Sequence, residues 1–257
     1  MHCHRGLVTG VGAALLIAAL CSCTQSSDQA APPTSTAAGS LVATGTVPTV
    51  ANDLASNSAH HSLEVPGEQF GLLADYWTEY DTGAWQTLQP KGISLSVHLV
   101  PVATLTGDPP EVLVGSFDGV TTLLAAMPGL DGLPIAETRE SPNAVPGYLI
   151  SSNYPFDNRL TVEGFSAPLQ ARWQTLAGDE PLTEPGLVTA GVYGNRMTFT
   201  YLILVRNNGD TGYHQRIVQD TLTVPEAVPP ASTPTSSPTP TPTSGAAPAS
   251  SVPTTSG

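Results

Sequence analysis

The sequence of 257 residues predicts a mainly β protein, built as an antiparallel sandwich or a curled sheet with one short helix. Three observations favour this class. Several short runs alternate apolar and polar residues, which is the period of a strand with one buried face. Gly, Pro, Asp or Asn residues bound these runs, as expected of turns between strands. An Asn-Gly pair separates two of the longest runs, and this pair is the strongest short-range signal for a hairpin.

The clearest element is the hairpin over residues 197–224. Its first strand carries apolar residues at every second position, namely Met197, Phe199, Tyr201, Ile203 and Val205. After the turn at 207–210, residues 213–224 resume a β-branched pattern. We predict positive φ at Asn208 and Gly209, in a turn of two residues or slightly more. Phe199, Tyr201 and Ile203 should then lie opposite the run 217–222.

Four other runs predict further strands: 70–80, 93–102, 159–165 and 169–176. In the second of these, Ile93 and Leu95 alternate with Ser94 and Ser96, so one face should be buried and the other solvated. Residues 118–127 are the exception, because their apolar residues recur at helical spacing and Pro128 follows them. They predict the short helix, while Gly115 and Gly119 weaken its extension back toward Pro110.

Composition divides the chain into four parts. Residues 1–22 read as a leader, and residues 23–61 as a disordered tether, because they are rich in Ala, Ser, Thr and Pro and carry only Asp28 and Asp53 as charges. Residues 62–226 are long enough for a single β-rich domain with a core. Residues 227–257 contain no charge and read as a disordered Pro/Thr/Ser tail, either bearing glycans or threading the cell wall, or else inert.

The end of the leader indicates a membrane anchor. An apolar run over 7–20 is followed by Cys21, Ser22 and Cys23, with Leu20 three positions before Cys23. This ending resembles the lipobox of bacterial lipoproteins, which implies cleavage before Cys23 and a diacylglycerol on its thiol. An ordinary secretory signal or a transmembrane helix is the alternative, but this run of 14 residues is shorter than the roughly 18 to 20 needed to span a bilayer. Cys23 would be the only cysteine left, which fits acylation better than a leftover thiol.

The charge balance limits the partners. Without Arg5, which would leave with the leader, 7 basic residues face 21 acidic ones. Nucleic acid is therefore disfavoured, because binding its phosphates needs a basic patch. Adhesion to anionic lipid headgroups is disfavoured for the same reason, so we expect the acyl chains to hold the protein at the outer side of the cell membrane.

Residues 105–130 carry a second resemblance. Leu105-Thr106-Gly107-Asp108, then a helix-like run, then Met127-Pro128-Gly129-Leu130 look like the strand-helix junction of actinobacterial lipoproteins of the Mog1/PsbP-like type. The resemblance implies an α+β fold as the alternative to a β sandwich. It implies no catalytic residues.

No motif in the chain predicts a cofactor, a metal or a nucleophile. The sequence contains no H-E-x-x-H, C-x-x-C, P-loop or G-x-S-x-G pattern. His60 and His61 fall in the predicted tether, where a lone pair is more often solvated than bound to a metal. His98 and His214 stand alone on predicted strands, so we interpret them as surface or hydrogen-bonded residues.

One acidic and aromatic cluster is a candidate binding site, with Asp75, Trp77, Glu79, Asp81 and Trp85 as its members. At the strand period, Asp75, Trp77 and Glu79 share one face, opposite Leu72, Ala74 and Tyr76. An aromatic plate flanked by carboxylates can grip a sugar, and two of the carboxylates could also form the pair of a glycosidase. The alternative is that Trp77 packs under a loop while the acids only solubilise an outer face.

These features leave three functions open. The first, which we favour, is a lipid-anchored envelope protein with a non-enzymatic domain that binds a glycan, a lipid, a peptide or a protein. The second is a hydrolase of envelope glycans that uses Asp and Glu. The third is a structural cell-wall tether that depends on the two low-complexity arms.

Overall fold

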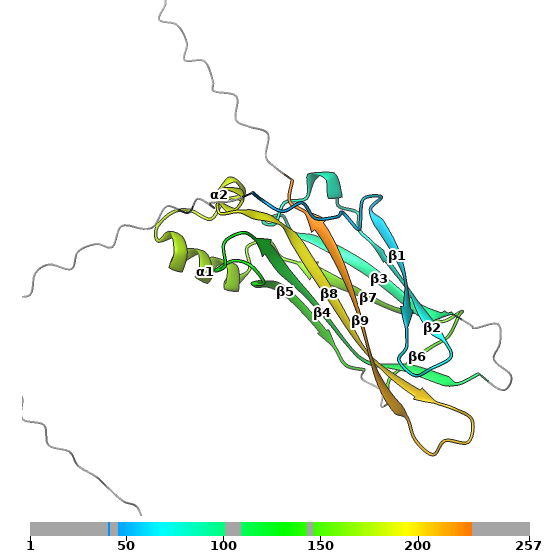
Figure 1. Ribbon diagram of the computed structural model, residues 1–257. Coiled ribbons are helices and arrows are strands. Elements are labelled where there is room, and N and C mark those ends of the chain that lie inside the picture. Colours follow the sequence, from blue (N-terminus) through cyan, green and yellow to red (C-terminus); the bar gives the residue numbers. More distant parts are fainter. Residues whose placement is uncertain (1–40, 42–45, 101–108, 143–145, 228–257) are drawn as a thin grey trace, which may run out of the picture. The chain divides into compact units, whose positions relative to one another are not determined.

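The computed structural model describes residues 41, 46–100, 109–142 and 146–227, and it is mainly β (Figure 1). Two antiparallel sheets face each other and enclose one hydrophobic core. The predicted fold class, a β sandwich with helix as the minor component, is confirmed. Within the described residues the last element is a strand rather than the helix of the α+β alternative.

The first sheet contains four strands in the order β1, β2, β3 and β7. Their bounds are Ser58–Glu64, Gly71–Trp77, Lys91–Val100 and Phe156–Val162. Along β2 the burial alternates strictly, with Leu72, Ala74 and Tyr76 turned into the core. β3 does the same at Ile93, Leu95 and Val97, as the alternation in the sequence predicts.

The second sheet contains β5, β4, β8 and β9 in that order, and β6 also pairs with β4. The bounds are Pro134–Glu140, Glu111–Ala125, Val192–Arg206 and His214–Pro225, with Tyr148–Ile150 for β6. β4 and β8 are 15 residues long each and pair over nearly their whole length. They therefore form the spine of the molecule.

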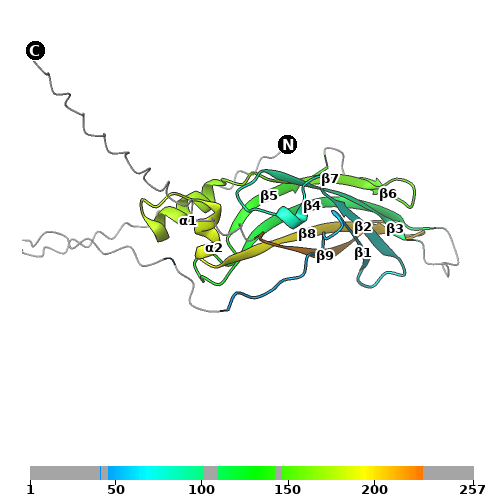
Figure 2. The same cartoon turned by 90° about the horizontal axis from the view of Figure 1, so that it is seen from above.

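Three short helices complete the described fold. The 3-10 helix η1 spans Thr82–Ala84, α1 spans Ala167–Ala177 and α2 spans Glu184–Thr189. Figure 2 shows α1 and α2 together at one end of the sheets, the end where β4 finishes and β8 begins. That end of the sandwich is thus covered by helix, whereas β6 lies toward the other.

Aromatic rings from both sheets fill the centre of the core. Tyr76 stacks on Phe199 with ring centroids 4.7 Å apart, and Phe117 contacts Tyr201 at 5.4 Å. All four side chains have no exposed surface. Each such ring pair contributes about 0.5–1.5 kcal/mol beyond the area that it buries.

Two predicted elements are wrong in type. Residues 118–127 belong mostly to strand β4, because Phe117, Thr121 and Leu123 point into the core at a period of two and Gly119 disfavours a helix. Residues 169–176 belong to helix α1 instead of a strand, with Leu169 and Trp173 buried one helical turn apart.

The ordered domain also begins earlier than the predicted boundary at residue 62. Strand β1 starts at Ser58 and pairs with β2, and Leu54 is fully buried. Asp53 forms three hydrogen bonds with Thr223 of β9: its backbone amide donates to the Thr223 carbonyl, and its carboxylate accepts from the Thr223 amide and hydroxyl. The composition of this segment resembles a linker, but the neighbouring strands supply its hydrogen bonds. At the other end, Ala227 still donates to Trp85, one residue past the predicted domain end.

The hairpin of β8 and β9 is confirmed, with Tyr201 opposite Val218 and Phe199 opposite Asp220. Ile203 faces Arg216, one residue outside the predicted run. Its turn differs from the prediction. Among the described residues of the loop only Gly209 has a positive φ, of 91°, so the connection is not a two-residue turn with both central residues left-handed.

The predicted leader at 1–22, Cys23 and most of both predicted arms lie outside the described residues. Residues 101–108, which carry part of the second resemblance, lie outside them as well. In the part of the chain that the structure describes, no helix is long and apolar enough to cross a membrane.

Candidate functional site

The predicted cluster is only partly assembled. Asp75 and Trp77 do share the outer face of β2, and Trp77 is 42% exposed. Asp75 is not free to receive a ligand, because its carboxylate pairs with His60 of β1 at 2.6 Å and lies 3.9 Å from His98 of β3. His60 and His61 are therefore strand residues with carboxylate partners, rather than the solvated tether residues predicted.

The other three members of the cluster lie elsewhere. Trp85 has no exposed surface and donates from its indole nitrogen to Asn195 at 2.6 Å, so it is a core residue and the prediction of a binding role is wrong. Asp81 caps η1 by accepting from the Gly83 backbone at 2.9 Å. Glu79 is exposed just past the end of β2. The cluster therefore does not form a single ligand-binding plate.

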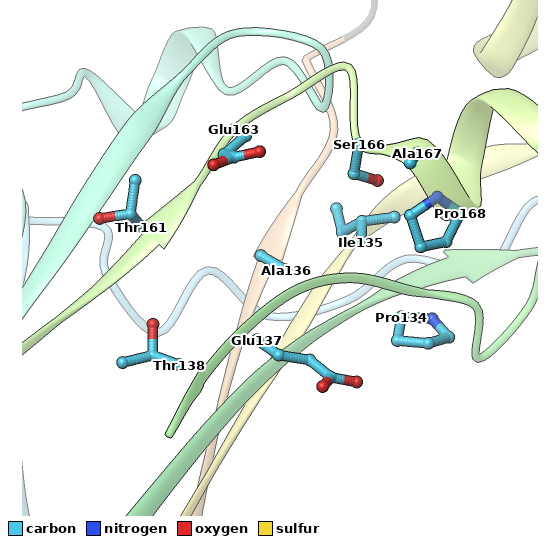
Figure 3. Close-up of a pocket in the computed structure, with 10 residues that line it drawn as sticks. All are labelled: Pro134, Ile135, Ala136, Glu137, Thr138, Thr161, Glu163, Ser166, Ala167 and Pro168. Atoms are coloured by element: carbon cyan, nitrogen blue, oxygen red, sulfur yellow. The ribbon is translucent and has the colours of Figure 1, made fainter. Parts of the chain in front are cut away.

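A better candidate site lies where the edge strands of the two sheets meet, at the start of α1. Figure 3 shows its lining in two rows. One row is residues 134–138 of β5, and the other runs from Thr161 and Glu163 into residues 166–168. The pocket has a volume of about 440 Å³. This lies within the range of about 300–1,000 Å³ usual for small-ligand sites. We call it the α1 pocket.

The local sequence explains how the second row is held. Gly164 lies two residues past the end of β7 with φ of 80°, and a Cβ at this position would lie 2.2 Å from the Leu88 carbonyl oxygen. Only glycine fits this turn. The chain then bends so that Ser166 donates from its backbone to the Gly164 carbonyl, and α1 begins with Pro168 in its first turn. The turn therefore fixes where Ser166 and the helix start lie.

Ser166 has a hydroxyl without a partner. The residue is 7% exposed, and its Oγ is buried and forms no hydrogen bond with any described residue. A serine before a helix commonly accepts from a backbone amide of the first turn, but this one does not. Figure 3 shows the side chain extending from the helix start toward Ile135, into the space between the two rows.

The lining of the α1 pocket is acidic and otherwise uncharged. Glu163 comes from one row and Glu137 from the other, and both are exposed. Thr138 and Thr161 add a hydroxyl from each side. None of the ten described lining residues is basic. The pocket thus offers carboxylate acceptors, hydroxyls that donate or accept, and the first turn of a helix.

A second hollow lies toward the opposite end of the sandwich, near β6. Its lining is mostly apolar and includes three of the exposed large hydrophobic residues of the described chain, Val100, Leu149 and Tyr154. Its volume is about 390 Å³. It carries no charged side chain among its described lining residues, so it offers contact area without directional polar groups.

One region with perturbed pKa values is a buried cluster that includes Glu184 of α2. Glu226 accepts from the backbone and hydroxyl of Thr87 at 3.1 and 2.8 Å, while Glu184 accepts from the Leu88 backbone at 3.1 Å. Burial, with Glu184 beside it, raises the pKa of Glu226 to about 8. Burial lowers the pKa of Lys91 to about 8, opposed by the two carboxylates.

This cluster is a buried structural network rather than an open site. The Lys91 ammonium donates to the backbone carbonyls of Gln86 and Gln89 and lies 4.6 Å from the centroid of the Trp85 ring. Lys91 and Glu226 are 6% and 8% exposed. The cluster ties α2, the end of β9 and the loop before β3 together. Perturbed pKa values often mark functional sites, but structural networks cause them too.

Part of the α1 pocket has a signal in the sequence. Ser166 followed by Pro168 is a helix-start pattern, and Leu169, Trp173 and Leu176 recur at spacings of four and three. Reading α1 correctly would have placed Ser166 at a helix start. The pairing of Glu137 with Glu163 carries no sequence signal, because it depends on two edge strands from different sheets. Among the described residues, no group of three potential ligands is placed to hold a metal ion.

Comparison with known proteins adds no function. No family model matches the chain, and no curated protein matches it in sequence. A crystal structure of a protein from Archaeoglobus fulgidus is similar at 11% identity, covering 63% of this chain and 98% of its own, with a TM-score of 0.26. A similarity this low carries no argument about this chain.

Proposed function

We propose that this protein is a lipid-anchored envelope protein whose β sandwich binds a small ligand in the α1 pocket without transforming it. The observation that carries this proposal is the buried, unpartnered Ser166 hydroxyl in the wall of the α1 pocket. A buried polar group without a hydrogen bond costs about 1–3 kcal/mol of stability. A ligand that bonds this hydroxyl recovers that cost, so the pocket favours occupancy.

The anchoring part of the proposal depends on the residues around Cys23. Leu20 and Ser22 occupy the positions that resemble a lipobox, and the excess of acidic residues leaves the acyl chains as the membrane contact. Changing Cys23 to Ala should move the protein from the membrane fraction to the soluble fraction. Intact mass of the parent should show a diacylglycerol adduct. Membrane partitioning that is the same for both proteins contradicts the anchor.

The binding part is tested on the mature chain carrying Cys23→Ala, so that detergent is not needed. A library of small neutral and charged compounds is titrated while amide chemical shifts are followed by NMR. We expect shifts to gather at residues 134–138 and 163–168. Compounds that bind only at the apolar hollow near Leu149 and Tyr154, or none that bind, would contradict the proposal.

A hydrolase is the second candidate, because the lining of the pocket includes two carboxylates, Glu137 from one row and Glu163 from the other. Glycosidases use two carboxylates on either side of the bond that they cleave. Incubation with envelope glycan and detection of new reducing ends distinguishes the two. Turnover that is lost in both Glu137→Gln and Glu163→Gln supports the hydrolase over the binding protein.

A further inference from the structure

We propose that the ligand of the α1 pocket is a neutral, hydroxyl-rich molecule, namely a single saccharide unit of an envelope glycan. This inference rests on the proposed binding function and names its ligand class. It follows from the charges, the hydrogen-bonding groups and the apolar surfaces that line the pocket.

The carboxylates exclude an anionic ligand. Glu137 and Glu163 line the pocket, and none of its described lining residues is basic. An ionised carboxylate only accepts hydrogen bonds, so a ligand group placed beside either one must donate. A phosphate or carboxylate would meet like charge with no compensating cation.

The helix start disfavours a simple cation. The first turn of α1 presents backbone amides with a partial positive charge, and the Ser166 hydroxyl does not cap them. A ligand group that contacts these amides therefore has to accept. An ammonium ion has three donors and no acceptor, so it satisfies the carboxylates but not the helix start.

A hydroxyl group meets both demands, because it donates one hydrogen bond and accepts others. Several hydroxyls on one rigid ring can donate to Glu137 and Glu163 and accept near Ser166 at the same time. Thr138 and Thr161 add groups of either kind on the two rows. The pocket thus matches the alternating donors and acceptors of a sugar ring.

The remaining lining suits the C–H faces of such a ring. Pro134, Ile135 and Ala136 provide apolar surface on one row, and Ala167 and Pro168 provide it on the other. Small-ligand sites typically combine this kind of apolar wall with a few placed polar groups. The surface is modest and has no aromatic plate, so we expect weak binding of one unit rather than tight binding of a long chain.

The test uses sugars that differ in charge. Mannose, galactose, arabinose and N-acetylglucosamine are the neutral probes, glucosamine is the cationic probe and glucuronic acid the anionic one. Each is titrated against the mature Cys23→Ala chain by NMR at low and high salt. We expect at least one neutral sugar to bind at residues 134–138 and 163–168, with an affinity that salt does not change, and glucuronic acid to bind more weakly than any sugar that binds.

Variants then locate the contacts. Ser166→Ala should weaken the neutral sugar by about 2- to 10-fold, the value of one hydrogen bond. Glu163→Gln keeps a carbonyl acceptor, so it should weaken a neutral sugar only slightly but a cation strongly. Thr121→Val is the matched control. Thr121 has the other buried hydroxyl without a partner and lies opposite Ala136 across the β4–β5 pair, yet it does not line the pocket.

The outcomes separate this inference from the proposed function. If glucosamine alone binds at the pocket and salt weakens it, the saccharide class is wrong and the binding function stands. The same holds if an extended peptide binds there instead, between the free edges of β5 and β7. If none of the probes and no library compound shifts the pocket residues, both proposals are overturned. Equal weakening by Ser166→Ala and Thr121→Val would show an indirect effect of packing and overturn the assigned contact.

Discussion

The two edges at which the sheets of the sandwich meet differ in how their polar side chains are arranged. At one edge β1 of the first sheet lies beside β9 of the second, and at the other edge β7 lies beside β5. Polar side chains bridge the first edge. Asp220 of β9 binds His61 of β1 at 2.9 Å and the Tyr76 hydroxyl at 2.7 Å, and Arg216 pairs with Glu68 at 2.8 Å. At the second edge, Glu140 of β5 accepts from Asn158 of β7, and a pocket lies beyond this bridge, at the start of α1.

The difference lies in how the polar groups are used. At the β1–β9 edge, Tyr76 donates to Asp220 and lies 3.1 Å from the Tyr201 hydroxyl. Burial, with Tyr201 and Asp220 nearby, raises the pKa of Tyr76 far above its ordinary value, so this hydroxyl keeps its proton. At the β5–β7 edge the Ser166 hydroxyl is equally buried and has no partner among the described residues. Polar side chains bridge both edges, but the β5–β7 edge leaves one buried hydroxyl without a partner at its α1 end.

The largest expected effect is the loss of the Asp220 carboxylate. Its side chain is 10% exposed and, from the second sheet, binds His61 and Tyr76 of the first. Removing it leaves the buried Tyr76 hydroxyl without this acceptor and the half-buried His61 without its carboxylate. We expect Asp220→Ala to lower the free energy of unfolding by about 3 kcal/mol, measured by denaturant titration.

Asp75→Ala is the matched control for this change, because Asp75 also pairs with a histidine of β1 at short distance. The difference is exposure, since His60 is 68% exposed in that pair. An exposed ion pair contributes about 0–1 kcal/mol. If the two variants lose the same stability, the β1–β9 edge is not held by its buried bridge.

The next effect is a dependence on pH at the end of β9, where Glu226 follows the strand. Its pKa is raised by burial to about 8, so folding favours its protonated form. The sign follows directly. Stability from this group is fully present below the ordinary value near 4.5 and is lost as pH rises through about 8.

Lys91 has the opposite dependence, because its pKa is lowered from 10.5 to about 8 and folding favours its neutral form. Its contribution therefore grows as pH rises above 8. With Glu184 and Tyr80 also close by, we expect a loss on the order of 2 kcal/mol between pH 5 and 8. Thermal unfolding across this range measures it. Glu226→Gln should flatten the curve, and an unchanged curve would show that Glu226 does not cause it.

A smaller effect concerns the turn that joins β8 to β9, the strand at the β1–β9 edge. Gly209 has φ of 91°, and no atom lies within 4 Å of the place where a Cβ would be. Gly209→Val therefore costs stability only through the backbone, by about 1 kcal/mol or slightly more. Denaturant midpoints compare it with Gly212→Val, where φ is not positive and space is equally open. Equal midpoints would mean that the turn adapts.

The β1–β9 edge could be predicted from the sequence better than the β5–β7 edge. The hairpin of β8 and β9 follows from local alternation and from an Asn-Gly pair, so its strands and most of its register are predictable. The bridge that this hairpin makes is not. His61 and Asp220 are 159 residues apart, and β1 was hidden in a segment with the composition of a linker.

Predicting the β5–β7 edge required the correct secondary structure for two segments at once. Residues 118–127 and 169–176 each support an interpretation as helix or strand, because short apolar runs do not distinguish the two periods. Residues 118–127 form a strand because they pair within the second sheet, and residues 169–176 form a helix that packs at the end of the sandwich. The predicted site failed at Trp85 for a similar reason. An aromatic residue near acids can lie in the core as easily as on a surface, and only its partner Asn195 settles which.

The smallest expected effect distinguishes the two edges most directly. Ser166→Ala removes a buried hydroxyl that has no partner among the described residues, so no hydrogen bond is lost. The desolvation penalty of the buried hydroxyl disappears with it. We therefore expect the free energy of unfolding of Ser166→Ala to stay the same or to rise by up to about 1 kcal/mol. Asp220→Ala at the other edge should lower the same quantity. Thr121→Val should behave in the same way, since its hydroxyl is also buried and unpartnered. Denaturant titration of both variants without ligand is the measurement. A loss of more than about 1 kcal/mol in Ser166→Ala would show that this hydroxyl already stabilises the fold. The basis for a ligand in the α1 pocket would then be gone.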